Sequence, residues 1–493
     1  MNKQLRRLGA GILGCYLALF AMVNYVQVFR APALNTDSRN TRQIVRDFDR
    51  PRGQIISADG VVLAKTDKSA PGDPFEFQRS YPGGDLFGHI TGFLNFSFGA
   101  AGVEQTYNDE LSGNAVSQEY QTLRDLFIAH DSTGDVTLTM RADVQQVARD
   151  ALGERNGAVV AIDPRDGSVL AMWSFPSFDP NPLASHDGKA AQAAKSFFEA
   201  DPNRPLRGKG WQERFFPGST FKVVTGSTGV ESGKVTPTEP SFPVATEYKP
   251  PDGKPISNFG GESCGGALPE ILRISCNSSF AEMGAELLGP QIMQRGAAQF
   301  GFNERPPIDL PAAATSTFPD TGKSKALLGQ ASIGQFNTQA SPLQMALVSA
   351  GIANNGVIMT PHVMKEIRDS TGGVLRTFEP KVWKNAVSPQ SAATMRDAMV
   401  GVVEGGTGTA ARIPGIVVGG KTGTAQIDTA GPDQGVLAWF TCFAGPSGAT
   451  PTVAVTVLVE NQKGFSDATG GAVAAPIAKT VLQKILDIQS QGG

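Results

Sequence analysis

Histidine and cysteine are both scarce in this chain, with four of each among 493 residues. None of the histidines stands in an H-E-x-x-H pattern or beside cysteines at the spacing of a zinc site, so we expect no metal site and no cofactor. An excess of charge of one sign is also missing. The net charge is −3 and the isoelectric point is about 5.9, so composition gives no reason to expect a nucleic-acid partner.

Charge is absent altogether from one stretch near the N-terminus, residues 8–29. As a helix this stretch would be about 33 Å long, which is enough to cross a bilayer. Basic side chains precede it within residues 1–7, so the positive-inside rule places this tail in the cytoplasm and everything after Arg30 outside the cell. The sequence therefore predicts a single-pass protein of the cell membrane.

A cleaved signal peptide is the competing interpretation, because Ala31-Pro-Ala33 matches a small-x-small cleavage site. The apolar core of a signal peptide, however, usually has about 7–15 residues. The uncharged stretch is longer than that, which favours an anchor.

Two regions follow the anchor. Residues 30–135 are rich in Gly, Arg and Asp and contain only short strand-like runs, which predicts an extended, non-catalytic pedestal domain. Residues 136–493 carry strand signals at both ends: a hairpin over 159–173 near the start, and strands over 417–426, 437–443 and 453–459 near the end. An amphipathic helix over 144–152 and a closing helix over 474–488 flank them. This order predicts an α+β fold in which the first and last strands share one antiparallel sheet.

Three short motifs occur in the second region in an order that few protein families share. They are Ser219-Thr-Phe-Lys222, Ser275-Cys-Asn277 and Lys421-Thr-Gly423-Thr424. Each pattern alone is common and would be a weak signal. Three of them in this order indicate an acyl-transferase that uses a serine nucleophile.

The first motif supplies a nucleophile and a base. The run from Ser219 to Thr225 predicts the first turns of a buried helix, so Ser219 lies where free backbone N–H groups can bind a developing oxyanion. Residues three apart share a helix face, which brings the Lys222 amine within hydrogen-bond reach of the Ser219 hydroxyl. A lysine that is desolvated beside other cations can be neutral and take the serine proton. The alternative is an exposed serine at a helix start beside a solvated lysine.

The second motif predicts the opposite wall of a cleft. The Ser275 hydroxyl could relay protons, and the Asn277 amide could hold a substrate carbonyl. Taken alone, Asn277-Ser-Ser279 is more often a simple helix cap.

The third motif lies on a predicted strand whose glycines, Gly423 among them, let another backbone approach closely. Lys421 supplies a cation, and Thr422 and Thr424 supply hydroxyls, a combination suited to binding a carboxylate. The Thr424 N–H is a candidate for the second oxyanion donor.

With these motifs the chain resembles the class B penicillin-binding proteins, and most closely those of actinobacteria. The resemblance extends over nearly the whole length. It includes Arg50-Pro-Arg52-Gly53, Arg79-x-Tyr81-Pro82, His89-x-x-Gly92 and Gly102-Val103-Glu104 upstream, and Gly157 to Asp163, Gly334-Gln335, Ser341 to Met345, Ala353 to Gly356 and Gly470-Gly471 downstream.

The resemblance implies a penicillin-binding transpeptidase fold, related to serine β-lactamases, behind a dimerisation-type pedestal. It also implies a peptidoglycan D,D-transpeptidase that attacks the D-Ala-D-Ala end of a stem peptide and is inhibited covalently by β-lactams. Only about 105 residues separate anchor from catalytic domain, too few for a glycosyltransferase, so glycan polymerisation must come from a partner. The family suggests a polytopic membrane polymerase that works with division proteins.

Two other functions remain open at this point. A β-lactamase shares all three motifs, although such enzymes are usually compact and no convincing deacylating glutamate follows Asn277. A penicillin sensor or a catalytically silent division scaffold is the other alternative, and the intact motif set argues against it.

The cysteines suggest one disulfide. Cys15 lies in the predicted span and Cys442 in an apolar strand, which leaves Cys264 and Cys276 to meet in an oxidising exterior. A bridge across that spacing would stabilise the fold by about 3 kcal/mol and would tie Ser275-x-Asn277 to the preceding loop. Alternatively, Cys276 is a buried filler and Cys264 a free thiol.

Overall fold

The structure is a computed structural model that describes residues 3–26, 48–114, 133–426, 435–460 and 469–491. The chain divides into two compact units. One consists of Met1–Pro51 and Asp67–Gln78, and the other of Arg52–Thr66 and Arg79–Gly493.

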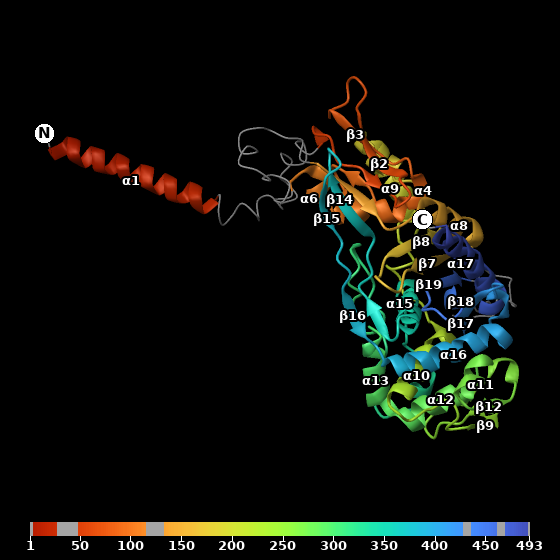
Figure 1. The fold of residues 1–493 in the computed structure, drawn as a ribbon. Helices are drawn as coiled ribbons and strands as arrows, with labels where there is room; N and C mark the ends of the chain where they lie inside the picture. Colours follow the sequence, from red (N-terminus) through yellow and green to blue (C-terminus); the bar gives the residue numbers. More distant parts are fainter. Residues whose placement is uncertain (1–2, 27–47, 115–132, 427–434, 461–468, 492–493) are drawn as a thin grey trace. The chain divides into compact units, whose positions relative to one another are not determined.

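The smaller unit contains helix α1 (Lys3–Tyr25), labelled in Figure 1. Within it, Arg6–Tyr25 form a 20-residue stretch with a mean hydropathy of 1.6. Among the helices of the described ranges, α1 is the one that is long and apolar enough to cross a membrane. Residues 27–29 of the predicted span lie outside the described residues.

The larger unit is built on a five-stranded antiparallel sheet with the order β17-β18-β19-β7-β8 (Figure 1). The strands are β7 (Gly157–Ile162), β8 (Val169–Phe175), β17 (Ile416–Gln426), β18 (Val436–Pro446) and β19 (Val453–Glu460). Because β19 pairs with β7, strands from both ends of the region share one sheet. The predicted α+β fold is confirmed.

Helices cover both faces of this sheet because successive side chains of a strand point to opposite sides. On β7, Val159 lies in one core with α8 (Ala142–Leu152) and α17 (Ala475–Ser490). Its neighbour Val160 lies in the other core, with α15 (Pro342–Ala353). Every residue of α15 is buried, as expected for a helix that is apolar on all sides.

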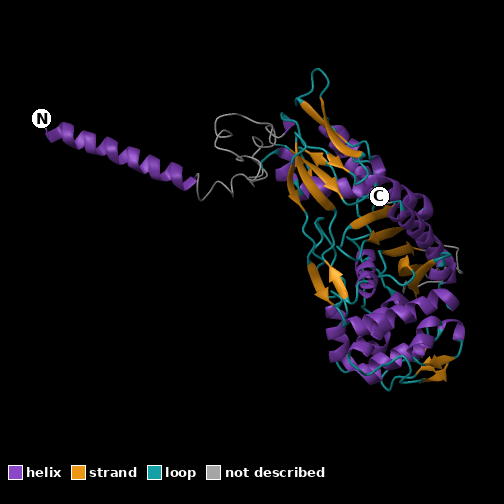
Figure 2. Cartoon of the chain, viewed as in Figure 1, coloured by secondary structure: helices purple, strands orange, loops and turns teal. Residues whose placement is uncertain are grey.

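A mainly helical part of the larger unit lies between β8 and β17 in the sequence, with short strands at its edge (Figure 2). Its elements are the 3-10 turn η3 (Gly218–Phe221), α10 (Lys222–Glu231), β9 (Phe242–Ala245), β10 (Glu247–Tyr248), β11 (Ile256–Ser257), η4 (Phe259–Gly261), β12 (Cys264–Gly266), α11 (Leu268–Arg273), α12 (Asn277–Glu282), the π-helical η5 (Met283–Leu288), α13 (Gly289–Gln299), α14 (Lys325–Ser332) and α16 (Pro389–Gly405).

A second, six-stranded sheet has the order β15-β14-β6-β1-β2-β3. Its strands are β1 (Ile55–Ile56), β2 (Val62–Lys68), β3 (Phe77–Ser80), β6 (Gly134–Leu138), β14 (Met364–Asp369) and β15 (Val374–Thr377). Strand β14, which comes late in the sequence, therefore pairs with β6, and β6 also pairs with β1 of the predicted pedestal. The remaining elements are α4 (Gly84–Thr91), β4 (Leu94–Asn95), β5 (Gly99–Ala100), α5 (Gly102–Thr106), α6 (Asn108–Ser112), η2 (Asn181–Ala184), α9 (Gly188–Ala200), β13 (Val357–Met359), β16 (Val382–Asn385), η6 (Thr409–Ala411) and η7 (Gly470–Ala474).

A buried ion cluster explains the charged motifs of the pedestal. Glu104 has no exposed surface, and its two carboxylate oxygens each lie 2.6 Å from an arginine Nε, one of Arg52 and one of Arg79. Burial opposes ionisation of Glu104, but the charges of Arg79 and Arg52 hold its pKa below the usual range. The hydroxyl of Tyr81 also donates to this carboxylate, at 3.4 Å. Motifs that are scattered along the sequence thus meet in one cluster.

Candidate active site

Ser219 lies half-buried on η3, directly before α10. Two glycines set this position. Gly218 has a φ of 52°, in the left-handed region that favours glycine. Its N–H donates to the carbonyl of Gly334 at 3.0 Å, and a Cβ on Gly334 would lie 2.2 Å from the Gly218 oxygen. This close approach places Ser219 at a helix start, where N–H groups lack intrahelical partners.

Lys222 is fully buried and points at the second motif. Its Nζ donates to Asn277 Oδ1 at 2.6 Å, to the Ser275 carbonyl at 2.7 Å and to Ser275 Oγ at 3.4 Å. Within the described residues, no hydrogen bond of Lys222 goes to Ser219, contrary to our expectation from the helical spacing. An ammonium group has only donors, so it turns to the acceptors of the second motif; a neutral amine would have a lone pair for a hydroxyl proton.

The second motif lies between α11 and α12 in a strained turn. Ser275 has a φ of 62°, which is uncommon for a residue with a side chain and costs about 1–3 kcal/mol. This conformation ends α11 and lets α12 begin at Asn277. Both the carbonyl and the hydroxyl of Ser275 therefore face Lys222.

The third motif joins the first two. Lys421 is fully buried on β17, and its Nζ donates to Ser275 Oγ at 2.8 Å and to the Thr422 carbonyl at 2.9 Å. Gly423 permits close packing of β17, which is an edge strand, on η3. A Cβ there would lie 2.9 Å from the Pro217 carbonyl oxygen and 2.9 Å from Thr220 Cγ2.

The two threonines of the third motif differ in their surroundings. Thr422 is buried, and its hydroxyl is paired with Thr407 Oγ1 at 2.6 Å. Thr424 is half-buried and lines a cleft. Of the two hydroxyls, that of Thr424 is therefore the one at the cleft wall.

Two buried lysines close together favour a neutral amine. Burial and the nearby charge of Lys421 hold the pKa of Lys222 well below its ordinary value. Burial alone lowers the pKa of Lys421 to about 7. The site can therefore offer Lys222 as a proton acceptor at a lower pH than a solvated lysine would allow.

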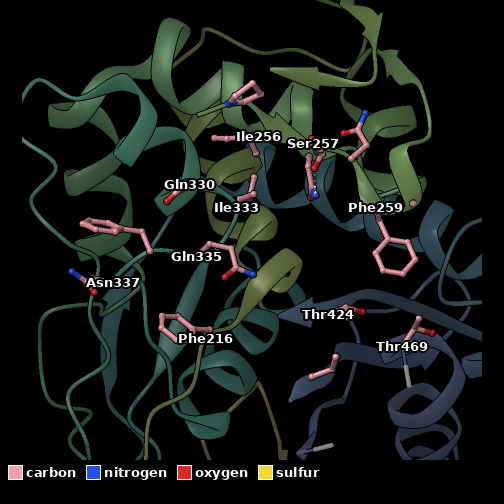
Figure 3. Close-up of a pocket in the computed structure, with 16 residues that line it drawn as sticks. Phe216, Ile256, Ser257, Phe259, Gln330, Ile333, Gln335, Asn337, Thr424 and Thr469 are labelled. Carbon is pink, nitrogen blue, oxygen red and sulfur yellow. Dashed lines mark hydrogen bonds between the residues drawn. The ribbon is translucent and has the colours of Figure 1, made fainter. Parts of the chain in front are cut away.

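The cleft beside these motifs has a volume of about 900 Å³. In Figure 3 Phe259 lies at the right, above Thr424 and Thr469, while Gln335 and Phe216 lie to the left. Among the described residues, none that lines the cleft is charged. Aromatic rings and amide side chains make its surface, which suits an uncharged peptide segment.

Comparison with known families decides the identity of this fold. The model described as "Penicillin binding protein transpeptidase domain" matches residues 157–483, and that described as "Penicillin binding protein A dimerisation domain" matches residues 52–136. The chain belongs to the penicillin-binding protein transpeptidase family.

Relatives and solved structures agree with this penicillin-binding fold. The chain is 36% identical to the peptidoglycan D,D-transpeptidase PbpA of Mycolicibacterium smegmatis and 34% identical to that of Mycobacterium tuberculosis, with 99% of both chains covered in each comparison. Penicillin-binding protein A from M. tuberculosis, solved as acyl-enzyme complexes with ceftriaxone and with penicillin G, matches with TM-scores of 0.81 and 0.80 at 33% identity. These matches cover 89% of this chain and 99% and 100% of the solved chains.

All the predicted site residues of this penicillin-binding protein meet in one region. Lys222, Ser275, Asn277 and Lys421 are linked by hydrogen bonds, and Ser219 and Thr424 lie on elements that pack together. Their catalytic and binding roles stay predictions. Thr407, the partner of Thr422, was not found from the sequence, since a lone threonine carries no pattern.

A disulfide joins Cys264 of β12 to Cys276, with 5.8 Å between the two Cα atoms. The bridge ties the middle residue of the second motif to the loop that precedes it. Cys442 is buried and unbridged.

Two other site types find no support. A Gly-x-Ser-x-Gly pattern, typical of α/β-hydrolases, occurs at Gly261–Gly265, but it lies at β12 rather than between a strand and a following helix. The part of the chain that the structure describes holds no group of three or more His, Cys, Asp or Glu side chains that could bind a metal ion.

Proposed function

We propose that this chain is a peptidoglycan D,D-transpeptidase that acts through a Ser219 acyl-enzyme and is inhibited by β-lactams. One observation carries the proposal: Lys222 and Lys421, from different motifs, both donate to Ser275 Oγ beside an uncharged cleft. The names and acyl-enzyme complexes of its relatives support the same reaction.

In the first step Ser219 Oγ attacks the carbonyl carbon of the penultimate D-Ala. Lys222, as the neutral amine, takes the hydroxyl proton. The carbonyl oxygen becomes an oxyanion that accepts from the N–H groups of Ser219 and Thr424. Lys421 binds the terminal carboxylate by charge, with the Thr424 hydroxyl beside it.

In the second step the C–N bond breaks and terminal D-Ala leaves with a proton that Ser275 relays from Lys222. The acyl group is now an ester on Ser219. The amine of a neighbouring stem peptide attacks the ester and gives a proton to Lys222. The C–O bond breaks, Lys222 returns the proton to the Ser219 oxygen, and the new amide completes a cross-link.

Topology follows from the sequence. We assign residues 1–7 to the cytoplasm, 8–29 to the membrane, and 30–135 and 136–493 to the pedestal and transpeptidase domains outside the cell. A polytopic glycan polymerase and division proteins are the proposed partners.

Mass spectrometry of the full chain after incubation with penicillin G tests the reaction. We expect a stable adduct on a peptide that contains Ser219, and no adduct in the Ser219→Ala variant. Labelling of folded Ser219→Ala at the wild-type rate would contradict the assignment.

A further inference from the structure

The loop before the second motif carries a buried amide that belongs to none of the three motifs. Asn258 is 7% exposed although its neighbours Ser257 and Phe259 are exposed. Its Oδ1 accepts from the N–H of Ser278 at 2.8 Å. Its Nδ2 donates to the carbonyls of Ala245 at 2.8 Å and Glu262 at 3.0 Å.

Helix α12 needs this contact because its own N-cap side chain is committed elsewhere. The N-cap is Cys276, whose sulfur is in the disulfide, and it makes no capping hydrogen bond to the helix backbone. A helix start without a side-chain acceptor leaves N–H groups unsatisfied. Asn258, twenty positions earlier in the chain, supplies the acceptor instead.

The same loop also holds the side chain of Asn277. Asn277 Nδ2 donates to the Ser257 carbonyl at 3.0 Å, while its Oδ1 accepts from Lys222 Nζ at 2.6 Å. The amide has a second N–H that remains for a substrate carbonyl. Ser257, at the end of β11, and Asn258 thus fix both the backbone that follows Asn277 and the direction of its amide.

We propose that Asn258 is a positioning residue for acylation: it links the first turn of α12 to the end of β9 and to the chain just before β12, and so aligns Asn277 with Lys222. This inference rests on the proposed function, because it concerns how fast Ser219 is acylated. The link needs both ends, the bond to Ser278 and the bonds to Ala245 and Glu262.

The test separates the binding constant K for penicillin G from the acylation rate constant k2 in the full chain. In Asn258→Ala both ends of the link are lost, and we expect k2 to fall at least about tenfold while K changes by less than about threefold, since misalignment acts on the reacting geometry. Asn258→Asp keeps an acceptor of the same shape but loses the donated bonds, so k2 should fall by about threefold or more. The aspartate variant decides the matter if the alanine variant does not fold.

Asn95 provides a matched control. It is 2% exposed, its Oδ1 accepts from the N–H of Ser97 at 2.7 Å, and its Nδ2 donates to the Leu183 carbonyl at 2.8 Å. Asn95→Ala should therefore lose comparable stability and keep k2 within about twofold.

Folded Asn258 variants with the wild-type k2 would overturn the inference, and so would an equal loss of k2 in Asn95→Ala. Absence of acylation in the wild type would instead overturn the proposed function. The two failures are therefore distinguishable.

Discussion

At the scale of single residues, the site contains two buried lysine amino groups that share one hydroxyl. Lys222 and Lys421 are both fully buried, and both donate to Ser275 Oγ, at 3.4 and 2.8 Å. Two cations this close raise the free energy of the state in which both lysines are charged. The pKa of the Lys222 amine, which burial already lowers, is therefore lowered further. The pair therefore sets the pH range in which Lys222 can act as a base.

The first prediction concerns this pair. Lys222 accepts a proton only when neutral, so the acylation rate should fall as pH drops through its pKa. Burial lowers the pKa of Lys421 to about 7, so Lys421 is charged below pH 7 and keeps the pKa of Lys222 low. Lys421→Met removes that charge, and the acidic limb of the pH–rate profile should move to higher pH.

Acylation rates of both proteins from pH 4 to 9, each normalised to its plateau, measure the shift. Lys195→Met, which removes a surface lysine paired with Glu199, is the control and should leave the limb unmoved. A limb that stays in place or moves to lower pH in Lys421→Met would contradict this account.

At the scale of elements, we expect catalysis to depend on how closely β17 packs on η3. The second prediction is that Gly423→Ala destabilises the fold by about 1–3 kcal/mol and slows acylation. A Cβ at Gly423 would lie 2.9 Å from the Pro217 carbonyl oxygen, which is backbone and cannot swing away. Gly401→Ala is the control, because its Cβ would meet nothing within 4 Å and alanine favours helix α16.

Denaturant unfolding and penicillin labelling of the two variants give the measurement. We expect Gly401→Ala to be as stable as the wild type or more stable, with unchanged labelling. Wild-type stability and labelling in Gly423→Ala would show that the strand can shift without consequence.

The third prediction concerns the disulfide between Cys264 and Cys276. Its removal in Cys264→Ala should lower the free energy of unfolding by about 3 kcal/mol, on the chain-entropy model. Peptide mapping without reduction checks the bond itself: both cysteines should resist alkylation in denatured, unreduced protein. Free alkylation of both would rule the bridge out, and Cys442→Ala controls for the loss of a buried thiol.

Local sequence patterns predicted where strands and helices lie better than they predicted which distant segments contact each other. Short apolar runs identified β7, β18 and β19, and the motif residues indicated the site, because both signals lie within a few consecutive positions. The pairing of β14 with β6 and the contact of Asn258 with Ser278 join distant segments. A strand's period does not name the strand beside it, so neither could be predicted from one sequence.

At the scale of the whole molecule, residues of the pedestal and of the transpeptidase domain contact each other within the larger unit. His89 of α4 lies in the region matched by the dimerisation model, and its Nε2 donates to the carbonyl of Pro205, in the transpeptidase region, at 2.7 Å. Its ring also meets Phe178 and Trp211 edge-on, with centroids 5.3 and 6.4 Å apart. A buried neutral imidazole thus belongs to the contact between the two domains.

The fourth prediction is that this histidine makes stability depend on pH. Burial lowers the pKa of His89 from 6.5 to about 4, so below pH 6.5 the unfolded chain binds a proton that the folded chain refuses. Stability should fall as the pH drops from about 6.5 to 4, by about 3 kcal/mol for the full shift. His89→Gln keeps an N–H donor for the Pro205 carbonyl but cannot titrate, so it should lose this part of the pH dependence.

Urea unfolding of both proteins at several pH values isolates the effect, because the carboxylates and the other histidines are common to both and cancel in the difference. Equal pH slopes in the two proteins would mean that His89 has the same pKa in the folded and unfolded chains, and the contact between the domains would then tolerate a charge.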